Sequence, residues 1–204
     1  MSHASFSFHC SLIMKRIGIF GGSFNPVHLG HTALAAAICE QGLVDEVWLM
    51  VSPQNPLKRN ADLLDEEVRL TMVRLAVADY PMLQACDFEF RLPRPSYTYH
   101  TLQALREAYP DCEFSLIIGE DNWESFGRWY RSDEILRMTP IIVYPRSGSV
   151  TMVMPVDCRL SIVNSPLLPY SSTEIRTLIA SGQDVCHMLH PDVAQYIHQH
   201  NLYR

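Results

Sequence analysis

Short apolar runs alternate with amphipathic runs from Lys15 to the end of the chain, and this alternation constrains the fold more than any other feature. The apolar runs have the length of strands and are bounded by turn residues, whereas the runs between them have the length and periodicity of helices. Such alternation predicts an α/β fold, an open parallel sheet with helices on both faces. The expected strands are residues 15–20, 46–51, 83–90, 114–118, 141–144 and 159–163, and the expected helices are residues 29–41, 65–78, 99–108, 132–138, 172–180 and 191–200.

The size of the chain indicates a single domain. Its 204 residues are 48% apolar, which is enough to bury one substantial core and too little for two full-sized domains. We expect residues 14–204 to form this domain, because Met14 directly precedes the first strand. Residues 1–13 lack a basic segment and a convincing cleavage site, so we expect an extension, disordered by default, and no export signal.

The charge and cysteine pattern excludes several classes of partner. The chain has 16 Lys and Arg against 22 Asp and Glu, and a net charge of −6 opposes nucleic acid as a main partner. No apolar run approaches the roughly 20 residues that cross a bilayer, so no membrane partner is expected. The 6 cysteines form no C-x-x-C pair, which fits reduced thiols in a cytoplasmic protein. The oligomeric state stays open, a homo-oligomer included.

The stretch GGSFNPVHLGH, from Gly21 to His31, follows the first strand. The first turn between strand and helix is a favoured ligand site in an open parallel sheet. Gly21 and Gly22 allow backbone N–H groups to approach a ligand, Ser23 adds a hydroxyl, and the helix start attracts anions. The stretch matches neither a P-loop nor a G-x-G-x-x-G fingerprint. It therefore predicts a phosphate cradle.

His28 and His31 are three residues apart, so they should project from one face of the first helical turn toward that anion. An imidazolium in this place can stabilise developing phosphate charge. The alternative is that the two histidines cap the helix or pack. A metal site would need a further ligand, and none lies nearby in the sequence, so no metal ligands are assigned.

GSFNPVHLGH resembles the G-x-F-[DN]-P-x-H-x-G-H signature of nucleotidyltransferases, which move an adenylyl or cytidylyl group between nucleotides and phosphorylated acceptors. The resemblance implies a Rossmann-like fold and adds Phe24 to the ligand contacts expected of Gly21, Gly22 and Ser23. The family most often has Asp where this chain has Asn25. Because the amide keeps an acceptor oxygen but loses the charge, we assign Asn25 no acid or base role.

Residues Ser171 to Arg176, SSTEIR, resemble the [IS]-S-S-T-x-[IV]-R signature near the end of these enzymes. Ser171 and Glu174 have capping-box spacing, and Arg176 offers a forked donor to phosphate oxygens. A well-capped helix without a ligand is the alternative. The resemblance implies that Ser171, Ser172 and Thr173 contact substrate and that Arg176 is catalytic.

Residues 95–102, PSYTYHTL, are similar to the P-S-Y-T-x-[DE]-T-L segment of nicotinate mononucleotide adenylyltransferases. The resemblance implies that Tyr97 and Thr98 line the base pocket of the acceptor nucleotide. His100 replaces the usual acidic residue. Capping of the helix by Thr98 is the alternative explanation for a hydroxyl at this point.

Residues 118–130, IGEDNWESFGRWY, resemble the I-G-x-D-x(7)-W-[YH] stretch of the same family. Asp121, just past a strand and close to Gly119, is placed to accept hydrogen bonds from ribose hydroxyls. Trp129 would stack on the pyridine ring of the acceptor. A lone tryptophan is more often a core residue, and its spacing from Gly119 and Asp121 favours the ligand role here.

Two basic residues in loops complete the expected site. Lys58 lies in a segment that resembles the P-x-x-P-[PL]-[HK]-K loop after the second strand, with Leu57 in place of the usual His. It is expected to contact the triphosphate, although a loop lysine is usually just solvated. Arg146 follows the fifth strand, where the family closes over the adenosine.

Together the motifs imply that ATP and nicotinate mononucleotide react to give nicotinate adenine dinucleotide and pyrophosphate, a step in NAD biosynthesis. Mg2+ is the expected cofactor, bound mainly through the ATP phosphates because the chain offers no obvious carboxylate cage. A phosphopantetheine adenylyltransferase, the same reaction on nicotinamide mononucleotide, and a catalytically silent nucleotide-binding protein are the alternatives.

Overall fold

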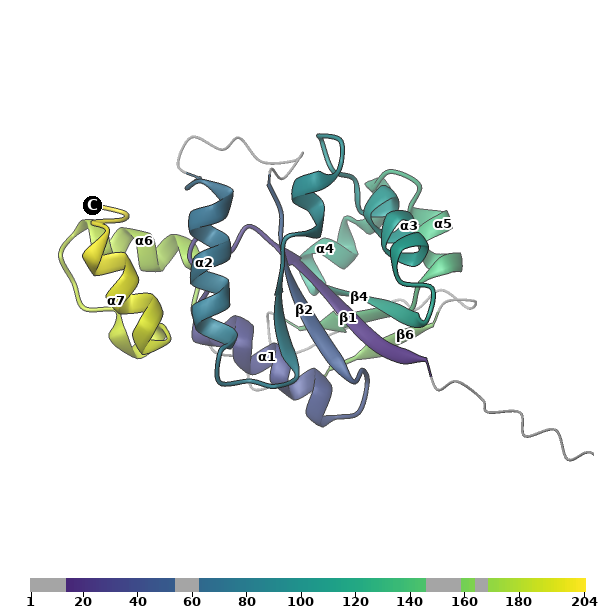
Figure 1. The fold of residues 1–204 in the computed structure, drawn as a ribbon, viewed down its shortest axis with the longest axis horizontal. Coiled ribbons are helices and arrows are strands. Elements are labelled where there is room, and N and C mark those ends of the chain that lie inside the picture. The colour runs from purple at the N-terminus through teal and green to yellow at the C-terminus, as the bar shows by residue number, and fades with distance from the viewer. Residues whose placement is uncertain (1–13, 54–62, 146–158, 164–168) are drawn as a thin grey trace, which may run out of the picture.

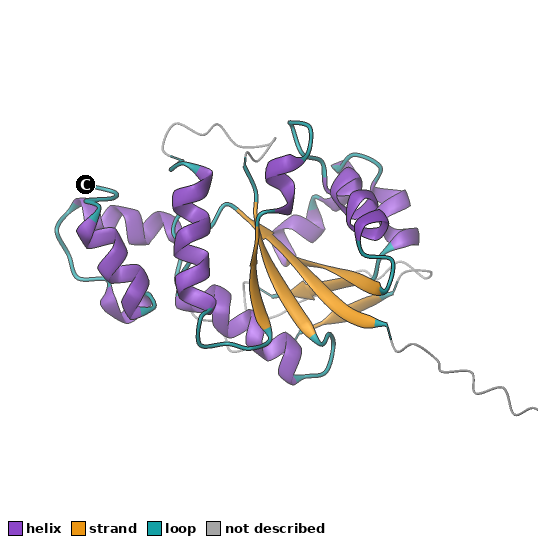
Figure 2. Ribbon diagram, viewed as in Figure 1, coloured by secondary structure: helices purple, strands orange, loops and turns teal. Residues whose placement is uncertain are grey.

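The computed structural model describes residues 14–53, 63–145, 159–163 and 169–204. Within these residues six strands form one parallel sheet in the order β3-β2-β1-β4-β5-β6 (Figure 2). The strands are β1 (Lys15–Gly22), β2 (Glu46–Val51), β3 (Leu83–Cys86), β4 (Cys112–Gly119), β5 (Ile141–Tyr144) and β6 (Leu160–Ile162). The predicted α/β fold with an open parallel sheet is confirmed. Because the strand order reverses between β1 and β4, a ligand site is expected beyond the carboxyl ends of these two strands.

The helices begin and end close to where the sequence pattern predicts. The described residues contain α1 (Leu29–Glu40), α2 (Glu66–Val77), α3 (Thr98–Ala108), α4 (Glu120–Glu124), α5 (Ser132–Met138), α6 (Ser172–Ala180) and α7 (Pro191–Gln199). All six predicted helices are present, and only the short α4 was missed, because five residues are too few to show a helical period. In this part of the chain no helix combines the length and apolar character needed to span a bilayer.

Helices cover both faces of the sheet, and the alternation of side chains along the strands shows which helix lies on which face. In β2, Val47 and Leu49 belong to the large apolar cluster with residues of α1, α2, α6 and α7. Trp48 and Met50 point to the opposite face and pack with Leu105 of α3. Figure 1 accordingly shows α1 and α2 on one side of the strands and α3 and α5 on the other, with α6 and α7 beyond α2. Burial on both faces explains the continuous apolar runs of these strands.

The third predicted strand is shorter than expected. Residues 83–90 were predicted as one strand, but β3 ends at Cys86, and Phe88–Arg91 form a 3₁₀ turn. The reason lies in the neighbouring strand, because β2 ends at Val51 and its last pairing with β3 joins Met50 to Cys86. Beyond that point no strand of the described residues remains to pair with Phe88–Arg91. Alternating apolar and polar residues do not by themselves distinguish an unpaired turn from a strand.

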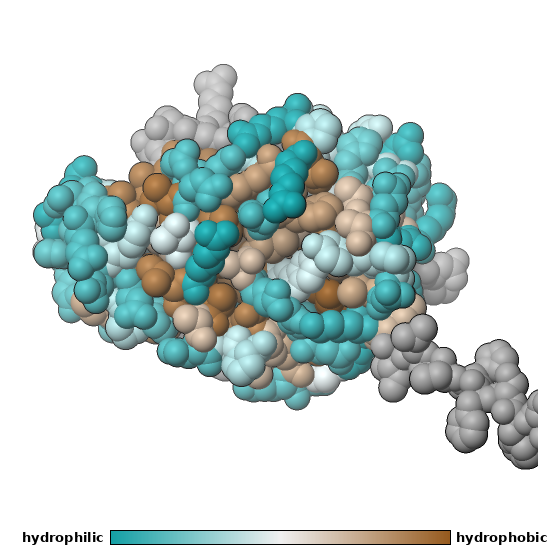
Figure 3. Space-filling view, viewed as in Figure 1, coloured by the Kyte–Doolittle hydropathy of each residue, from teal (hydrophilic) through white to brown (hydrophobic). Residues whose placement is uncertain are grey.

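Polar and apolar side chains occupy different parts of the molecular surface in the view of Figure 3. In Figure 3 hydrophilic side chains predominate around the rim, and apolar side chains gather in the middle of this view, between α2 and α3. The predicted extension at residues 1–13 lies outside the described residues.

Candidate active site

The turn between β1 and α1 places its two glycines in different surroundings. A Cβ on Gly21 would meet nothing within 4 Å, so this position opens onto the cavity that Gly21 lines. A Cβ on Gly22 would lie 2.9 Å from the ring of Phe24 and therefore clash with it. Phe24 has a φ of 45° and is 2% exposed, and its ring packs 5.1 Å from the ring of His31. Phe24 thus packs inside the turn and does not line the cavity, so its predicted contact with substrate stays a prediction.

His28 and His31 come together at the start of α1, as their spacing predicts. His28 is the N-cap and is 7% exposed, and the two ring centroids are 3.7 Å apart. The backbone N–H of His28 donates to Nδ1 of His31 at 3.2 Å. Because Nδ1 accepts this bond, a neutral His31 carries its proton on Nε2, where it can serve as a donor. His31 therefore also caps the start of α1, as the alternative interpretation predicts, and this hydrogen bond determines which nitrogen of the neutral ring carries the proton.

The second predicted motif lies against the first. Arg176 donates from Nη1 to the carbonyl oxygen of Asn25 at 2.8 Å, and Ser172 donates to the carbonyl oxygen of Pro26 at 2.9 Å. Arg176 also contacts the hydroxyl of Thr173 at 3.4 Å. The two bonds of Arg176 use two of the five N–H donors of the guanidinium, so this side chain both holds the turn and retains donors for phosphate.

The predicted cap of α6 is present. The side chain of Ser171 accepts a hydrogen bond from the backbone N–H of Glu174 at 3.1 Å. This bond satisfies one of the free N–H groups in the first turn of the helix. Ser171 is exposed, so its predicted contact with substrate remains a prediction beside this structural role.

A cavity of about 220 Å³ opens beyond the carboxyl ends of β1, β2, β4 and β5. Trp129 lines it and packs on Phe126 with ring centroids 5.3 Å apart. The Nε1 atom of Trp129 is buried and has no hydrogen-bond partner among the described residues. Asp121 is not part of the lining, although its neighbour Asn122 is. The predicted site residues along the cavity wall are Gly21, Gly22, Ser23, Tyr97, Thr98, Gly119 and Trp129.

The start of α3 does not have Thr98 as its cap. Thr98 is the first residue of the helix and not its cap, because the N-cap is Tyr97, whose side chain makes no capping bond. Both residues line the cavity, and Tyr97 is 39% exposed. His100 does not line the cavity, and its ring lies 5.4 Å from the ring of Tyr130, which does. Lys58 and Arg146 lie outside the described residues.

Glu89 is a site residue that the sequence analysis missed. It lines the cavity, is 8% exposed, and accepts a hydrogen bond from the hydroxyl of Thr101 at 2.9 Å. Burial raises the pKa of its carboxyl above the ordinary value, and hydrogen bonds from Thr101, Ser52 and Ser96 oppose this rise. The available signal was a single acid between two phenylalanines.

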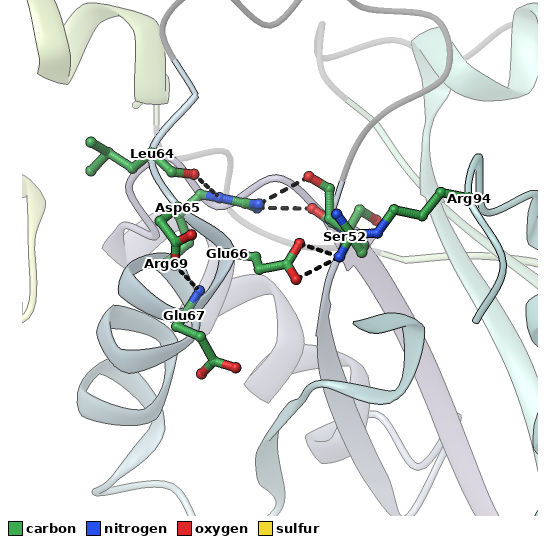
Figure 4. Close-up of polar contacts among 8 residues, drawn as sticks. Ser52, Leu64, Asp65, Glu66, Glu67, Arg69 and Arg94 are labelled. Atoms are coloured by element: carbon green, nitrogen blue, oxygen red, sulfur yellow. Dashed lines mark hydrogen bonds and ion pairs between the residues drawn. The ribbon is translucent and has the colours of Figure 1, made fainter. Parts of the chain in front are cut away.

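Arg69 is the second residue that sequence reasoning missed, and it joins the segments around the cavity. Its side chain is 1% exposed and donates to four backbone carbonyls: those of Ser23 at 2.7 Å, Ser52 at 2.9 Å, Pro53 at 3.2 Å and Leu64 at 2.8 Å. Figure 4 shows the guanidinium lying between Leu64 and Ser52. Burial lowers the pKa of Arg69. The sequence signal that could have indicated a buried arginine was its position within the apolar stripe of α2.

A surface ion pair joins α2 to the segment that precedes α3. Arg94 donates to both carboxylate oxygens of Glu66, at 2.6 and 2.8 Å, as Figure 4 shows. One nitrogen, Nη2, serves both oxygens, so the contact is a charge-assisted hydrogen bond shared between them and not a forked bidentate pair. Arg94 directly precedes Pro95 and Ser96, so the pair ties one wall of the cavity to the helix that carries Arg69.

Comparison with known proteins places these motifs in a family. The model of the cytidylyltransferase-like family matches residues 19–178. The probable nicotinate-nucleotide adenylyltransferase of Bacteroides thetaiotaomicron is 49% identical over 185 residues, which cover 91% of this chain and 92% of that protein. The chain belongs to the nicotinate-nucleotide adenylyltransferases of the cytidylyltransferase-like family. The relative from Flavobacterium johnsoniae is 40% identical over 191 residues, covering 93% of this chain and 99% of its own length.

Solved structures agree with this family and its fold. A putative nicotinate-nucleotide adenylyltransferase from Vibrio parahaemolyticus superposes with a TM-score of 0.69 at 26% identity, covering 94% of this chain and 96% of the other. The Plasmodium falciparum nicotinic acid mononucleotide adenylyltransferase, complexed with NaAD, has a TM-score of 0.75 at 21% identity, with 93% and 97% covered. At this lower identity the likeness concerns the fold alone.

The described residues of this cytidylyltransferase-like protein include no group of three or more His, Cys, Asp or Glu that could hold a metal ion.

Proposed function

We infer that this chain transfers the adenylyl group of ATP to nicotinate mononucleotide, giving nicotinate adenine dinucleotide and pyrophosphate in NAD biosynthesis. The observation that carries this inference is that Gly21, Gly22 and Ser23, at the point where the strand order reverses, line one cavity together with Tyr97, Thr98 and Trp129. His28 and His31 follow this turn in the chain at the start of α1 and are not themselves in the lining. The names of the related proteins support the same reaction.

The reaction joins two phosphates without a protein nucleophile. An oxygen of the 5'-phosphate of nicotinate mononucleotide attacks the α-phosphorus of ATP in line, and the bond from that phosphorus to the β-phosphate oxygen breaks. Pyrophosphate leaves with the bonding electrons. Catalysis then consists of positioning and charge stabilisation, and positioning alone can contribute on the order of 7–11 kcal/mol.

The chain's own groups supply that stabilisation. His31 donates from Nε2 and His28 stands beside it, while the N-terminus of α1 attracts the anion. Arg176 and Lys58 complete the charge around the phosphates. Trp129 offers its face to the pyridine ring, and Asp121 with Gly119 binds ribose hydroxyls.

Mg2+ accompanies ATP in this proposal. When bound, it neutralises phosphate charge and helps pyrophosphate to leave. Mg2+ would be held mainly through the ATP phosphates, with waters completing its coordination. The proposed location is the cytoplasm, where ATP and the mononucleotide are found. We also propose that nucleic acid is not a partner, because the net charge of −6 opposes binding to its phosphate backbone.

The test is a direct assay with the purified full chain. The protein is incubated with ATP and Mg2+ plus nicotinate mononucleotide, nicotinamide mononucleotide or phosphopantetheine, and dinucleotide and pyrophosphate are followed by chromatography. We expect product from the nicotinate substrate at a rate well above that from the other two.

The other outcomes are equally informative. A higher rate with nicotinamide mononucleotide would change the substrate while keeping the reaction. Product from phosphopantetheine alone would identify the sister enzyme, and ATP binding without any product would indicate a silent nucleotide-binding protein. A matched variant, His31→Ala, should remove the activity of the correct substrate.

A further inference from the structure

The C-terminal end of the chain folds back from α7 toward the turn that precedes α1. Asn201 and Tyr203 have φ values of 51° and 63°, a left-handed conformation that reverses the direction of the chain. The backbone N–H of Leu202 donates to the carbonyl oxygen of Ile197 at 3.1 Å and closes the end of α7. Figure 1 shows this end beside α6 and α7. Tyr203 consequently packs against the large apolar cluster.

Tyr203 reaches a residue of the predicted phosphate cradle. Its hydroxyl donates to Oδ1 of Asn25 at 2.8 Å, although 178 residues separate the two in sequence. Asn25 is 4% exposed, so the bond is shielded from water. Burial raises the pKa of the Tyr203 phenol well above its ordinary value, while the charges of Arg176 and Arg69 act in the opposite direction. The phenol therefore stays protonated at neutral pH and keeps its donor.

Other elements hold the same turn by its peptide carbonyls. The donors come from α2 and α6: Arg69 to Ser23 at 2.7 Å, Arg176 to Asn25 at 2.8 Å and Ser172 to Pro26 at 2.9 Å. The Tyr203 bond differs from these because it holds a side chain. Asn25 precedes His28, the N-cap of α1, by three residues, so a displacement of Asn25 moves the start of the helix that carries both histidines.

We propose that Tyr203 is a positioning residue for adenylyl transfer, in which its hydroxyl orients the Asn25 side chain and thereby places His28 and His31. The proposal rests on the proposed function above. The Tyr203 hydroxyl donates to the Asn25 side chain, so Tyr203 is assigned an action through Asn25.

The hydrogen bond from Tyr203 also assigns a role to the side chain of Asn25. Both Asn and Asp carry an Oδ1 acceptor, so the bond from Tyr203 needs the acceptor and not the charge. Asn25→Asp should therefore keep much of the activity, whereas Asn25→Ala should lose at least the part of it that Tyr203→Phe loses.

The experiment compares Tyr203→Phe with Tyr196→Phe in the full chain. Tyr196 is a partly buried tyrosine of α7, so the control removes a hydroxyl from the same region without touching the turn. We expect Tyr203→Phe to lower kcat about three- to tenfold, the range of one lost hydrogen bond, with both KM values within about twofold. Tyr196→Phe should match the wild type. Unfolding curves give the folded fraction, so that kcat is expressed per folded molecule.

A double-mutant cycle then tests the route through Asn25. In the Asn25→Ala background, Tyr203→Phe should change kcat by less than about 1.5-fold, because the partner is already gone. A reduction in kcat that is the same in both backgrounds would overturn the proposal. So would an unchanged kcat in folded Tyr203→Phe, since a merely structural tyrosine would affect only the unfolding curve.

A readout independent of activity separates this proposal from the proposed function. In histidine side-chain NMR spectra of the substrate-free protein, the signals of His28 and His31 should shift in Tyr203→Phe but not in Tyr196→Phe. His198, an exposed residue of α7, serves as the reference. If the wild type forms no dinucleotide, the proposed function fails, and these signals alone decide the role of Tyr203. Unmoved signals would overturn it.

Discussion

At the scale of single residues, His31 combines two tasks that sequence reasoning treats as alternatives. Its Nδ1 accepts the backbone N–H of His28, which ties down the start of α1. The same bond leaves the proton of a neutral ring on Nε2, the atom that can donate to a phosphate oxygen. In the proposed mechanism, capping and catalysis are thus served by opposite edges of one imidazole.

His31→Ala should lower kcat about 100-fold or more while the protein stays folded, because a donor that stabilises developing charge is lost. Steady-state kinetics and circular dichroism measure the two effects. His198→Ala is the matched control, an exposed histidine far along the chain on α7. Unchanged turnover in a folded His31→Ala protein would remove His31 from the mechanism.

Trp129→Ala should raise the KM for nicotinate mononucleotide about tenfold and leave the KM for ATP nearly unchanged, since stacking on an aromatic ring contributes about 1–3 kcal/mol per base. Trp123→Ala is the control, because Trp123 packs in the same cluster through Phe126 but does not line the cavity. A rise in the KM for ATP alone would reverse the assignment of the pocket.

At the scale of secondary-structure elements, α2 organises the edge of the sheet. Arg69 extends from this helix to carbonyls at the ends of β1 and β2 and to Leu64 before the helix start. Its pKa is lowered by burial, so the folded chain bears a desolvation cost that the hydrogen bonds to carbonyls offset. The element thereby fixes the spacing of two strand ends at the cavity.

Arg69→Lys should reduce the free energy of unfolding by about 2 kcal/mol or more, because lysine lacks the planar fork and leaves buried carbonyls without donors. Urea unfolding measures this. Arg74→Lys is the control, an exposed arginine in the last turn of the same helix. Equal midpoints for the two variants would contradict the role given to Arg69.

At the scale of the whole molecule, the cavity exists only because segments distant in sequence meet at one edge of the sheet. Glu89, from the turn after β3, faces the ends of β1 and β4 across this cavity. Its raised pKa means that the folded state holds the proton more tightly than the unfolded chain. The stabilisation is complete below the unfolded-state pKa and is lost as the pH rises through the folded-state pKa.

Glu89→Gln should therefore remove part of the loss of stability that the wild type shows as the pH rises above the ordinary carboxyl pKa and through the raised pKa of Glu89. The amide stays neutral and keeps an acceptor for the Thr101 hydroxyl. Urea midpoints at several pH values measure the effect, with the exposed Glu107→Gln of α3 as control. A wild type and a Glu89→Gln variant with parallel pH profiles would contradict it.

Much of the fold is predicted by local patterns in the chain. Strands with two buried faces and helices with capping signals obey local rules, so β1, β2, β5 and six helices lie where the residues predict them. The prediction for residues 83–90 was wrong because pairing depends on the length of β2, which is a property of another segment. The alternative of Thr98 as a cap does not hold, because the helix begins one residue earlier than predicted, with Tyr97 as its N-cap.

The amino-acid sequence alone determined the class of fold, the two histidines at the first turn and the motifs of the family, because those features depend on residues close together in the chain. Only the tertiary structure decided that Arg69 holds the strand ends, that Glu89 faces the cavity and that Tyr203 reaches Asn25. Those contacts join residues far apart in sequence. Their partners are backbone carbonyls and buried polar atoms, which leave no pattern in the order of side chains.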